Sequence, residues 1–375
     1  MGVRVPLKAG SNPDDRNWGQ TPMGSIGRSG VLGLGLALLG LALVLLGLGV
    51  GSTGLESLRP LWWGDGVEAA MARQIVWDIR LPRTLGAWAA GALLGLAGAV
   101  AQGLFRNPLA DPYLLGSASG ASLGVAAALA LMGGAGGMLG ASQAALSVSV
   151  YSAHWLVRLG LTGAAFVGAV AAVLLTLALA RGVQHTLRLL LAGVVVGVVL
   201  GACTSLILLI SPDSLQAMQG FLLGSTGFVG WTACLLLLAV WLPCLAAAGL
   251  LSRTLDALAL GEATAASLGL RLPPLRAALV AVLALATGTA VAQTGLIAFV
   301  GLAAPHLVRA VVSVPHGRLM ALASLMGGAL LAAADLLARG LLAPQELPVG
   351  VLTAVLGGGY LLWLMHRRTA IRGLL

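Results

Sequence analysis

The sequence VLGLGLALLGLALVLLGLGV occupies residues 31–50 and contains no charged side chain. An α-helix needs about 20 apolar residues to cross the ~30 Å hydrocarbon core of a bilayer. A second run of the same kind, LGAWAAGALLGLAGAVAQGL, occupies residues 85–104. Both runs are continuous, whereas the strands of a membrane β-barrel alternate apolar and polar residues over about ten positions. The two segments therefore predict an all-α membrane protein.

Composition extends this prediction to the whole chain. Hydrophobic residues make up 59% of its 375 positions and charged residues only 9%, against about 25% charged in an average soluble domain. A water-soluble fold could not bury this much apolar surface. The net charge of +9 does not indicate nucleic-acid binding, because the arginines are scattered between apolar runs, where they set membrane orientation. The composition therefore predicts that most of the chain lies in membrane lipid.

Ten apolar segments divide the chain. We predict a ten-helix transmembrane domain over residues 31–366, between a polar tail (1–30) and a basic tail (367–375). The polar lead and the run after it are both too long for a cleaved signal peptide. The predicted spans are 31–50, 85–104, 114–132, 157–180, 189–210, 229–250, 274–292, a broken element near 296–312, 319–338 and 350–366.

Basic residues predict the orientation of these spans. Ten crossings place both termini on the same side of the membrane. If that side is the cytoplasm, fifteen of the 21 Lys and Arg residues lie inside, as the positive-inside rule requires. We therefore expect a multi-pass protein of the bacterial inner membrane with both termini cytoplasmic. The six basic residues left outside are Arg59, Arg73, Arg80, Arg83, Arg158 and Arg339.

Glycine occurs at 54 positions, often at intervals of four residues. Small residues at this spacing let helix backbones approach closely within a membrane. The pattern predicts a tightly packed bundle. The series are Gly91 and Gly95; Gly116, Gly120 and Gly124; and Gly193, Gly197 and Gly201.

Motifs for catalysis and for metal binding are missing from the sequence. The single lysine, Lys8, has no glycine-rich run before it, so the chain has no Walker-type nucleotide site. There is no HExxH motif, and the three cysteines have apolar neighbours and no metal-type spacing. We expect the cysteines to pack in the bundle, and we predict neither a catalytic residue nor a metal site nor a cofactor bound by this chain.

One pattern keeps an enzymatic alternative open. Residues 120–124 read GASLG and match the GxSxG motif of serine hydrolases. An intramembrane serine protease could pair Ser122 with a helix histidine such as His306. The motif also arises easily by chance in a chain rich in Gly and Ala.

The longest predicted inside loop covers residues 251–273 and reads LSRTLDALALGEATAASLGLRLP. Its apolar residues recur at helical spacing, and Gly261 and Gly269 interrupt them. We predict two short helices with a glycine bend at the membrane surface. A simple connector would be shorter, as between Arg181 and Arg188.

Four stretches together resemble the permease family of ABC importers for ferric siderophores, haem and cobalamin. They cover most of the chain and follow the order found in that family. They are LPRTLGAWAAGALLGLAGAVAQGLFRNPLADP (81–112) with LLGSASGAS (114–122), LALGEATAASLGL (258–270), GLIAFVGLAAPHLVR (295–309) and ADLLARGLLAPQELPVGVLTAVLGG (334–358).

This resemblance implies a type II importer with ten helices per subunit. It implies a homodimer with the substrate path on its two-fold axis, two ATPase subunits inside and a periplasmic substrate-binding protein outside. ATP and Mg would be used by the partner ATPase. The cargo would be an iron complex, either haem or a ferric siderophore, or cobalamin.

The resemblance also implies site residues. The 251–273 loop is similar to the coupling helices that contact the ATPase. Arg80, Arg83 and Arg339 correspond to arginines that meet acidic residues of the binding protein, although membrane anchoring would also suit them. A path or gate role is implied for Gly301, Pro305 and His306. The residues implied for ATPase coupling are Leu260, Gly261, Glu262, Ala263, Ala266 and Gly269.

The sequence departs from the family pattern at two places, and a third class of protein is an alternative. The last span has Gly359 where the family usually has proline, which would change the shape of that helix, and the tail before Val31 is longer than usual. A secondary transporter is a third alternative. It would usually carry intramembrane charges for ion coupling, whereas here Asp335 and Arg339 lie near one end of a span.

Overall fold

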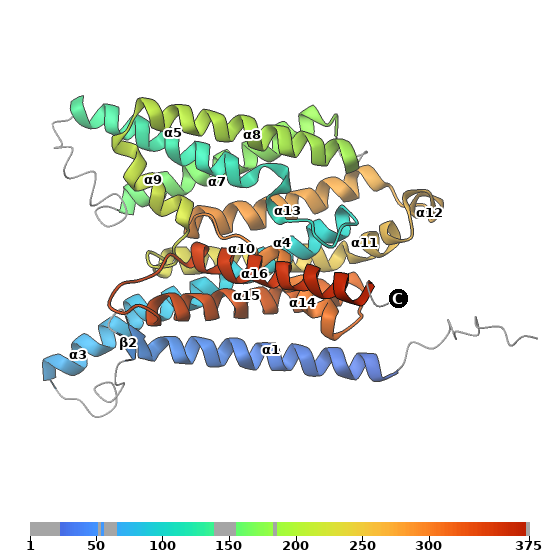
Figure 1. Ribbon diagram of the computed structural model, residues 1–375, viewed down its shortest axis with the longest axis horizontal. Coiled ribbons are helices and arrows are strands. Elements are labelled where there is room, and N and C mark those ends of the chain that lie inside the picture. The colour runs from blue at the N-terminus through green and yellow to red at the C-terminus, as the bar shows by residue number, and fades with distance from the viewer. Residues whose placement is uncertain (1–22, 52–53, 56–65, 139–154, 183–185, 373–375) are drawn as a thin grey trace, which may run out of the picture.

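The computed structural model describes residues 23–51, 54–55, 66–138, 155–182 and 186–372. Residues 1–22 of the predicted polar tail and residues 373–375 lie outside this part of the chain. The helices run side by side along the long axis of the molecule (Figure 1). The start of α1 and the end of α16 lie at the end that carries α12, called the α12 end; the opposite end is called the Asp335 end.

The prediction of an all-helical protein with about ten apolar helices is confirmed. Seven described helices are long and apolar enough to cross a bilayer, and shorter apolar stretches occur in three more. Each predicted span falls on one of them. They are α1 (Met23–Gly49), α4 (Leu81–Leu104), α5 (Ser117–Met138), α7 (Trp155–Leu179), α8 (Thr186–Ile210), α10 (Trp231–Leu250), α13 (Leu272–Thr294), α14 (Val300–Val311), α15 (His316–Gly340) and α16 (Val349–Arg372).

Short elements connect these helices. α9 was not predicted, and it fills the sequence between the fifth and sixth predicted spans. At the end of α1, two short antiparallel strands pair, and α3 and η1 lead directly into α4. The connecting elements are β1 (Val50–Gly51), β2 (Gly54–Leu55), α3 (Gly66–Gln74), η1 (Ile75–Arg80), η2 (Pro112–Leu115), α9 (Asp213–Leu223), α11 (Ser252–Ala259) and α12 (Glu262–Ser267).

Two terminal helices extend beyond their predicted spans. α1 begins at Met23, inside the predicted polar tail, and α16 continues to Arg372, through most of the predicted basic tail. An established helix adds residues at little cost, because only nucleation is unfavourable. The hydrophobic run therefore marks the membrane-spanning part of each helix better than it marks the helix ends.

α4 is the central helix, and nearly every residue from Pro82 to Leu104 is buried. It packs on α15, α13, α10, α14 and α1. Its glycines let neighbouring backbones come close. A Cβ atom at Gly91 would overlap the carbonyl oxygen of Gly327, and one at Gly95 would overlap that of Ala323. The glycine series on α4 therefore forms the contact with α15.

The same device joins α5 to α7. A side chain at Gly120 would overlap the backbone of Gly168, and one at Gly124 would overlap that of Ala164. The prediction of close packing through glycine is confirmed at these positions. It is wrong at Gly201, where a Cβ atom would meet nothing within 4 Å.

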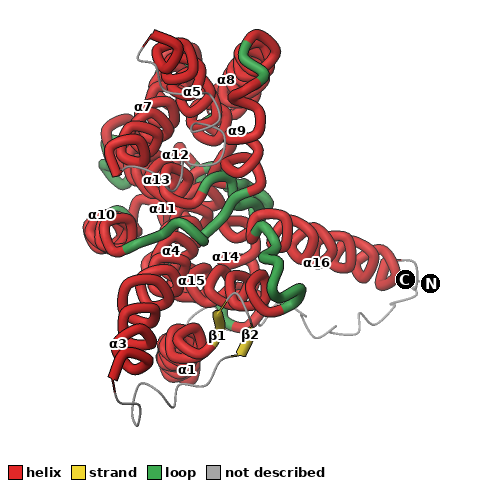
Figure 2. Tube along the Cα trace, turned by 90° about the vertical axis from the view of Figure 1, so that its left-hand side faces the viewer, coloured by secondary structure: helices red, strands yellow, loops and turns green. Residues whose placement is uncertain are grey.

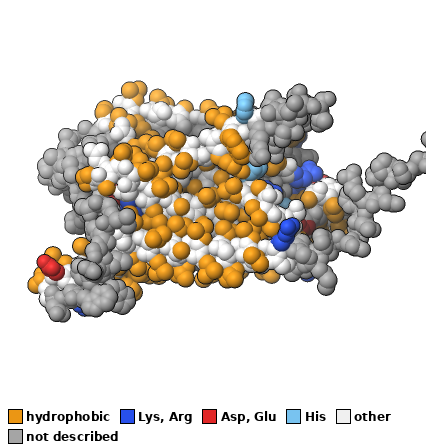
Figure 3. All heavy atoms as spheres, turned by 60° about the horizontal axis from the view of Figure 1, so that its bottom comes forward, with side chains coloured by type: hydrophobic (Ala, Val, Ile, Leu, Met, Phe, Trp, Pro, Cys, Tyr) orange, Lys and Arg blue, Asp and Glu red, His pale blue; other side chains and the backbone are white. Residues whose placement is uncertain are grey.

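The flanks of the bundle are apolar. Figure 3 shows the side that carries α1, where hydrophobic side chains cover a broad band and the visible Lys and Arg side chains lie toward the ends. α16 packs on α15, α14 and α9 and projects from the rest of the bundle in Figure 2. Its exposed apolar side chains include Val355, Leu356, Leu362 and Trp363.

Candidate functional site

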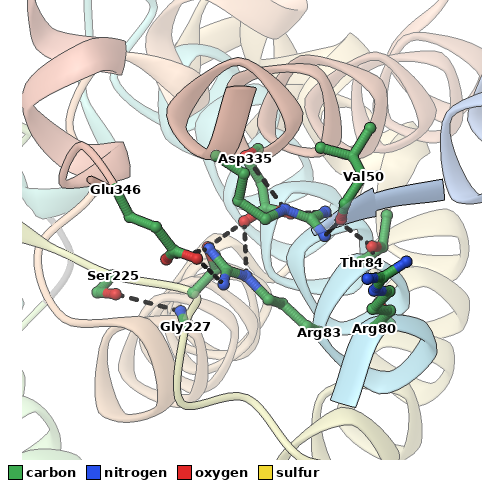
Figure 4. A network of polar contacts seen from close by, with 10 residues as sticks. Val50, Arg80, Arg83, Thr84, Ser225, Gly227, Asp335 and Glu346 are labelled. Atoms are coloured by element: carbon green, nitrogen blue, oxygen red, sulfur yellow. Dashed lines mark hydrogen bonds and ion pairs between the residues drawn. The ribbon is translucent and has the colours of Figure 1, made fainter. Parts of the chain in front are cut away.

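A buried polar network lies at the Asp335 end (Figure 4). Asp335 on α15 is completely buried and accepts three hydrogen bonds. One carboxylate oxygen accepts from Arg83 Nε at 3.1 Å and from Thr226 Oγ1 at 2.5 Å, and the other accepts from Arg339. A buried carboxylate is stable only when it is paired and hydrogen-bonded. Asp335 therefore joins α4, α15 and the loop before α10.

Glu346 completes the coordination of Arg83. Its two carboxylate oxygens accept from the guanidinium nitrogens NH1 and NH2 of Arg83 at 3.0 and 2.9 Å, the two-pronged geometry that arginine and carboxylate groups favour. Glu346 lies on the loop between α15 and α16, and its side chain is 31% exposed. Gly227 lies beside the pair: a Cβ there would be in ordinary contact with Glu346 at 3.7 Å and Arg83 at 3.8 Å.

The other arginines bind the end of α1 and its hairpin. Arg339 donates to the carbonyl oxygen of Val50 at 3.0 Å and to Thr84 Oγ1 at 2.9 Å. Arg80 donates to the carbonyl oxygen of Leu48 at 2.9 Å. All three arginines implied for docking are buried, because carboxylates and carbonyl groups of the same chain bind them, and their docking role stays a prediction.

Sequence reasoning missed these acidic and carbonyl partners. One signal was available, since Asp335 and Arg339 are four residues apart on a helix and lie inside an otherwise apolar span. Glu346 gave no such signal, because its partner Arg83 is 263 positions away.

At the α12 end, the 251–273 segment forms the two predicted helices. Gly261 separates α11 from α12 with φ +109°, and Gly269 follows α12 with φ +79°. These are backbone conformations that glycine adopts without strain. The predicted glycine bend is confirmed.

α11 faces the bundle. Leu255 and Leu258 are fully buried, and the helix packs on α4 and α15. Asp256 Oδ1 accepts from the backbone N–H of His316 at 3.0 Å and lies 2.7 Å from His316 Nδ1, at the first residue of α15. The apolar face of α11 is therefore used inside the chain.

α12 faces outward. Its single buried residue is Ala265, whereas Ala263 and Ala266 are exposed. The flanking Leu260, at 69%, and Gly269 are exposed as well. Glu262 binds Arg276 of α13, with 2.6 Å between Oε1 and NH2. Of the residues predicted to contact an ATPase, four are exposed on α12 or directly beside it, and Gly261 and Glu262 are half-buried.

The residues predicted to form a path or gate lie on α14. Gly301 and Pro305 are buried, and a Cβ at Gly301 would collide with Pro112. His306 is half-buried, and its ring lies edge-on to Tyr360 of α16 at 5.9 Å. Phe299 has φ +67° at the start of α14, after the predicted break. These contacts join α14 to its neighbours, and a gate role stays a prediction.

The GxSxG motif does not form a nucleophile elbow. Ser122 lies within α5 and donates to the carbonyl oxygen of Ala118 at 3.0 Å. α5 packs on α7, α8, α9 and α13, whereas α14, which carries His306, packs on α4, α15 and α16. Ser122 is thus a helix-packing residue. Among the described residues, no group of His, Cys, Asp and Glu side chains could hold a metal ion.

Comparison with known proteins fits this architecture. Residues 37–367 match the model of the FecCD transport family. The chain is 38% identical over 311 residues to the hemin transport system permease protein HmuU of Yersinia pestis, covering 82% of this chain and 87% of that one. It is 40% identical over 296 residues to the vitamin B12 import system permease protein BtuC of Escherichia coli O1:K1, covering 77% and 83%.

A solved structure agrees over nearly the full length. An inward-facing metal-chelate type ABC transporter superposes with a TM-score of 0.75 and 28% sequence identity, over 90% of this chain and 99% of that one. The family model, the two permeases and this structure lead to the same conclusion: the chain belongs to the FecCD transport family.

Proposed function

We propose that this chain is the permease subunit of an ABC importer that moves an iron complex or cobalamin across a bacterial inner membrane. The observation that carries the proposal is the exposed surface of α12 and of the turn before it, which presents Leu260, Ala263 and Ala266 at the end of a ten-helix bundle. A short helix with an exposed apolar face suits docking into a groove of a partner. The α12 end then faces the cytoplasm.

The partner would be an ATPase, because the chain has no Walker-type sequence of its own. Two such subunits would bind and hydrolyse ATP with Mg and would contact α12. A second copy of this chain would complete the substrate path. Support for the second copy comes from α16, which projects from the bundle (Figure 2) and keeps Val355 and Leu362 exposed.

At the Asp335 end, we propose that a periplasmic binding protein docks over the Arg83 network. Docking would then involve competition, since Glu346 already occupies the guanidinium group of Arg83. An acidic side chain of the binding protein would displace Glu346, which is partly exposed, and would leave Asp335, which is fully buried, in place.

Changing Glu346 to Gln is therefore expected to strengthen docking, because the amide competes less well for the arginine. The gain is limited because Asp335 still binds Arg83 in the variant; a change of about 1 kcal/mol lowers the Kd for the binding protein about fivefold. Surface plasmon resonance on nanodisc-embedded permease measures this. Glu68→Gln is the matched control, since Glu68 is exposed on α3 at the same end. Equal Kd values for the two variants would contradict the competition.

The whole proposal is tested by transport in proteoliposomes. The permease, its ATPase and its binding protein should assemble with two copies of this chain and take up haem, a ferric siderophore or cobalamin only with Mg-ATP. Buried intramembrane charges such as Asp335 would also suit an ion-coupled transporter. Uptake that follows a proton or sodium gradient and ignores ATP would therefore overturn the proposal.

A further inference from the structure

The attachment of α12 to the rest of the bundle differs from that of α11. α11 buries Leu255 and Leu258 against α4 and α15. α12 buries only Ala265. The Gly261 bend separates these two attachments. α12 is therefore held in place by polar contacts more than by packing.

The principal polar contact joins α12 to α13. Glu262 begins α12, and its Oε1 lies 2.6 Å from NH2 of Arg276. A second, weaker contact reaches Arg106, in the turn after α4, at 3.7 Å. The Arg276 side chain is 4% exposed and that of Glu262 is 40% exposed. A nearly buried arginine needs a carboxylate, so breaking this pair is unfavourable.

α13 connects this pair to the other end of the molecule. It runs from Leu272 to Thr294. At the end of α13, the carbonyl oxygen of Thr294 accepts a hydrogen bond from the backbone N–H of Ser225 at 2.8 Å. The loop that contains Ser225 also contains Thr226, which binds Asp335. A displacement of α13 at Arg276 would therefore reach the loop beside the Arg83 network.

We propose that Glu262 is a positioning residue that transmits force from α12 to α13 through Arg276 and is not an ATPase contact. The inference rests on the proposed function, since it assumes that an ATPase binds α12. The ATPase binds the exposed face formed by Leu260, Ala263 and Ala266. The ion pair keeps α12 at a fixed angle to α13, so that motion of the ATPase moves α13.

A charge swap separates the two roles of Glu262. Glu262→Arg and Arg276→Glu should each lower substrate uptake per ATP hydrolysed by about tenfold, a typical coupling effect. The double variant Glu262→Arg with Arg276→Glu restores opposite charges at the same positions and should return uptake to within about threefold of the original. A direct ATPase contact would not be restored, because the ATPase would still meet an arginine at position 262.

A milder variant covers the case in which the swapped pair does not fold. Glu262→Gln keeps the shape of the side chain and should lower uptake per ATP, while the Kd of the purified ATPase for nanodisc-embedded permease stays within about twofold. Leu260→Asp, on the exposed face, should instead weaken ATPase binding by at least about tenfold.

The outcomes distinguish this inference from the function on which it rests. Weaker ATPase binding by the Glu262→Gln variant, or a folded swap variant without restored uptake, would overturn the positioning role and leave the importer intact. Failure of the unmodified permease to bind any ATPase or to use ATP would instead overturn the proposed function.

Discussion

Replacing Asp335 with alanine is expected to destabilise the permease strongly. Asp335 is completely buried and pairs with both Arg83 and Arg339. Its removal leaves two buried guanidinium groups without this counter-ion, and removing one partner of a buried ion pair costs about 3–5 kcal/mol. Natural proteins have only about 5–15 kcal/mol of stability. Thermal unfolding of purified protein in detergent should show a large loss, together with low membrane yield.

Two variants complete this experiment. Asp335→Asn keeps the shape of the side chain and can keep the hydrogen bond from Thr226. Its loss of stability should therefore be smaller than that of Asp335→Ala. Asp78→Ala, at an exposed position on η1, controls for the loss of one carboxylate and should unfold at the original temperature. If the Asp335→Ala and Asp78→Ala variants unfold at the same temperature, the network contributes little to the stability of the protein.

Changing Gly98 to alanine is expected to have the second large effect. A Cβ at this position would overlap the carbonyl oxygen of Gly301 at the start of α14. The obstacle is backbone, so it cannot rotate away as a flexible side chain could. Overpacking a core typically costs about 1–3 kcal/mol, and the fixed backbone places this change at the upper end of that range. α14 should be displaced from α4.

The matched control is Gly201 to alanine on α8, where a Cβ would meet nothing within 4 Å. Alanine favours a helix over glycine by about 1 kcal/mol, so this variant should unfold at the same temperature or slightly higher. Differential scanning fluorimetry in detergent compares the two. Equal unfolding temperatures would show that α4 and α14 can separate without cost.

The helical architecture could be predicted from sequence because bilayer thickness fixes the length of each apolar run. The run 85–104 falls within α4, and the run 31–50 falls within α1 except for Val50, which begins β1. The two coupling-loop helices were also predictable, since Gly261 and Gly269 are local signals for a bend. α9 was missed because its 11 residues are too few to form a span and follow Pro212 directly.

The burial of the arginines could not be predicted, because it depends on distant partners. Arg83 binds Asp335 and Glu346, which are 252 and 263 positions away in the sequence. A hydropathy pattern does not show which distant residues pair. An arginine beside a span looks the same whether it faces water or a carboxylate of its own chain. The partner of the apolar face of α11 could not be predicted for the same reason. Periodicity shows which residues form the apolar face, but not whether that face packs on the same chain or on another protein.

α15 contacts its surroundings through polar side-chain contacts at both of its ends. His316 at its first turn binds Asp256, and Asp335 near its last turn binds Arg83. The helix has 25 residues, so it is roughly 37 Å long. Tilting such a rod by about 5° around its midpoint moves each end by about 1.6 Å, enough to separate an ion pair whose partner stays still.

Arg83 lies on α4, which contacts α15 along its length through Gly91 and Gly95. A tilt of α15 alone would therefore break contacts at its middle and at both ends together. We therefore expect α4 and α15 to move together. If access alternates between the two sides of the membrane, we expect the movement where other elements meet this pair, and the Gly261 bend between α11 and α12 is one such place.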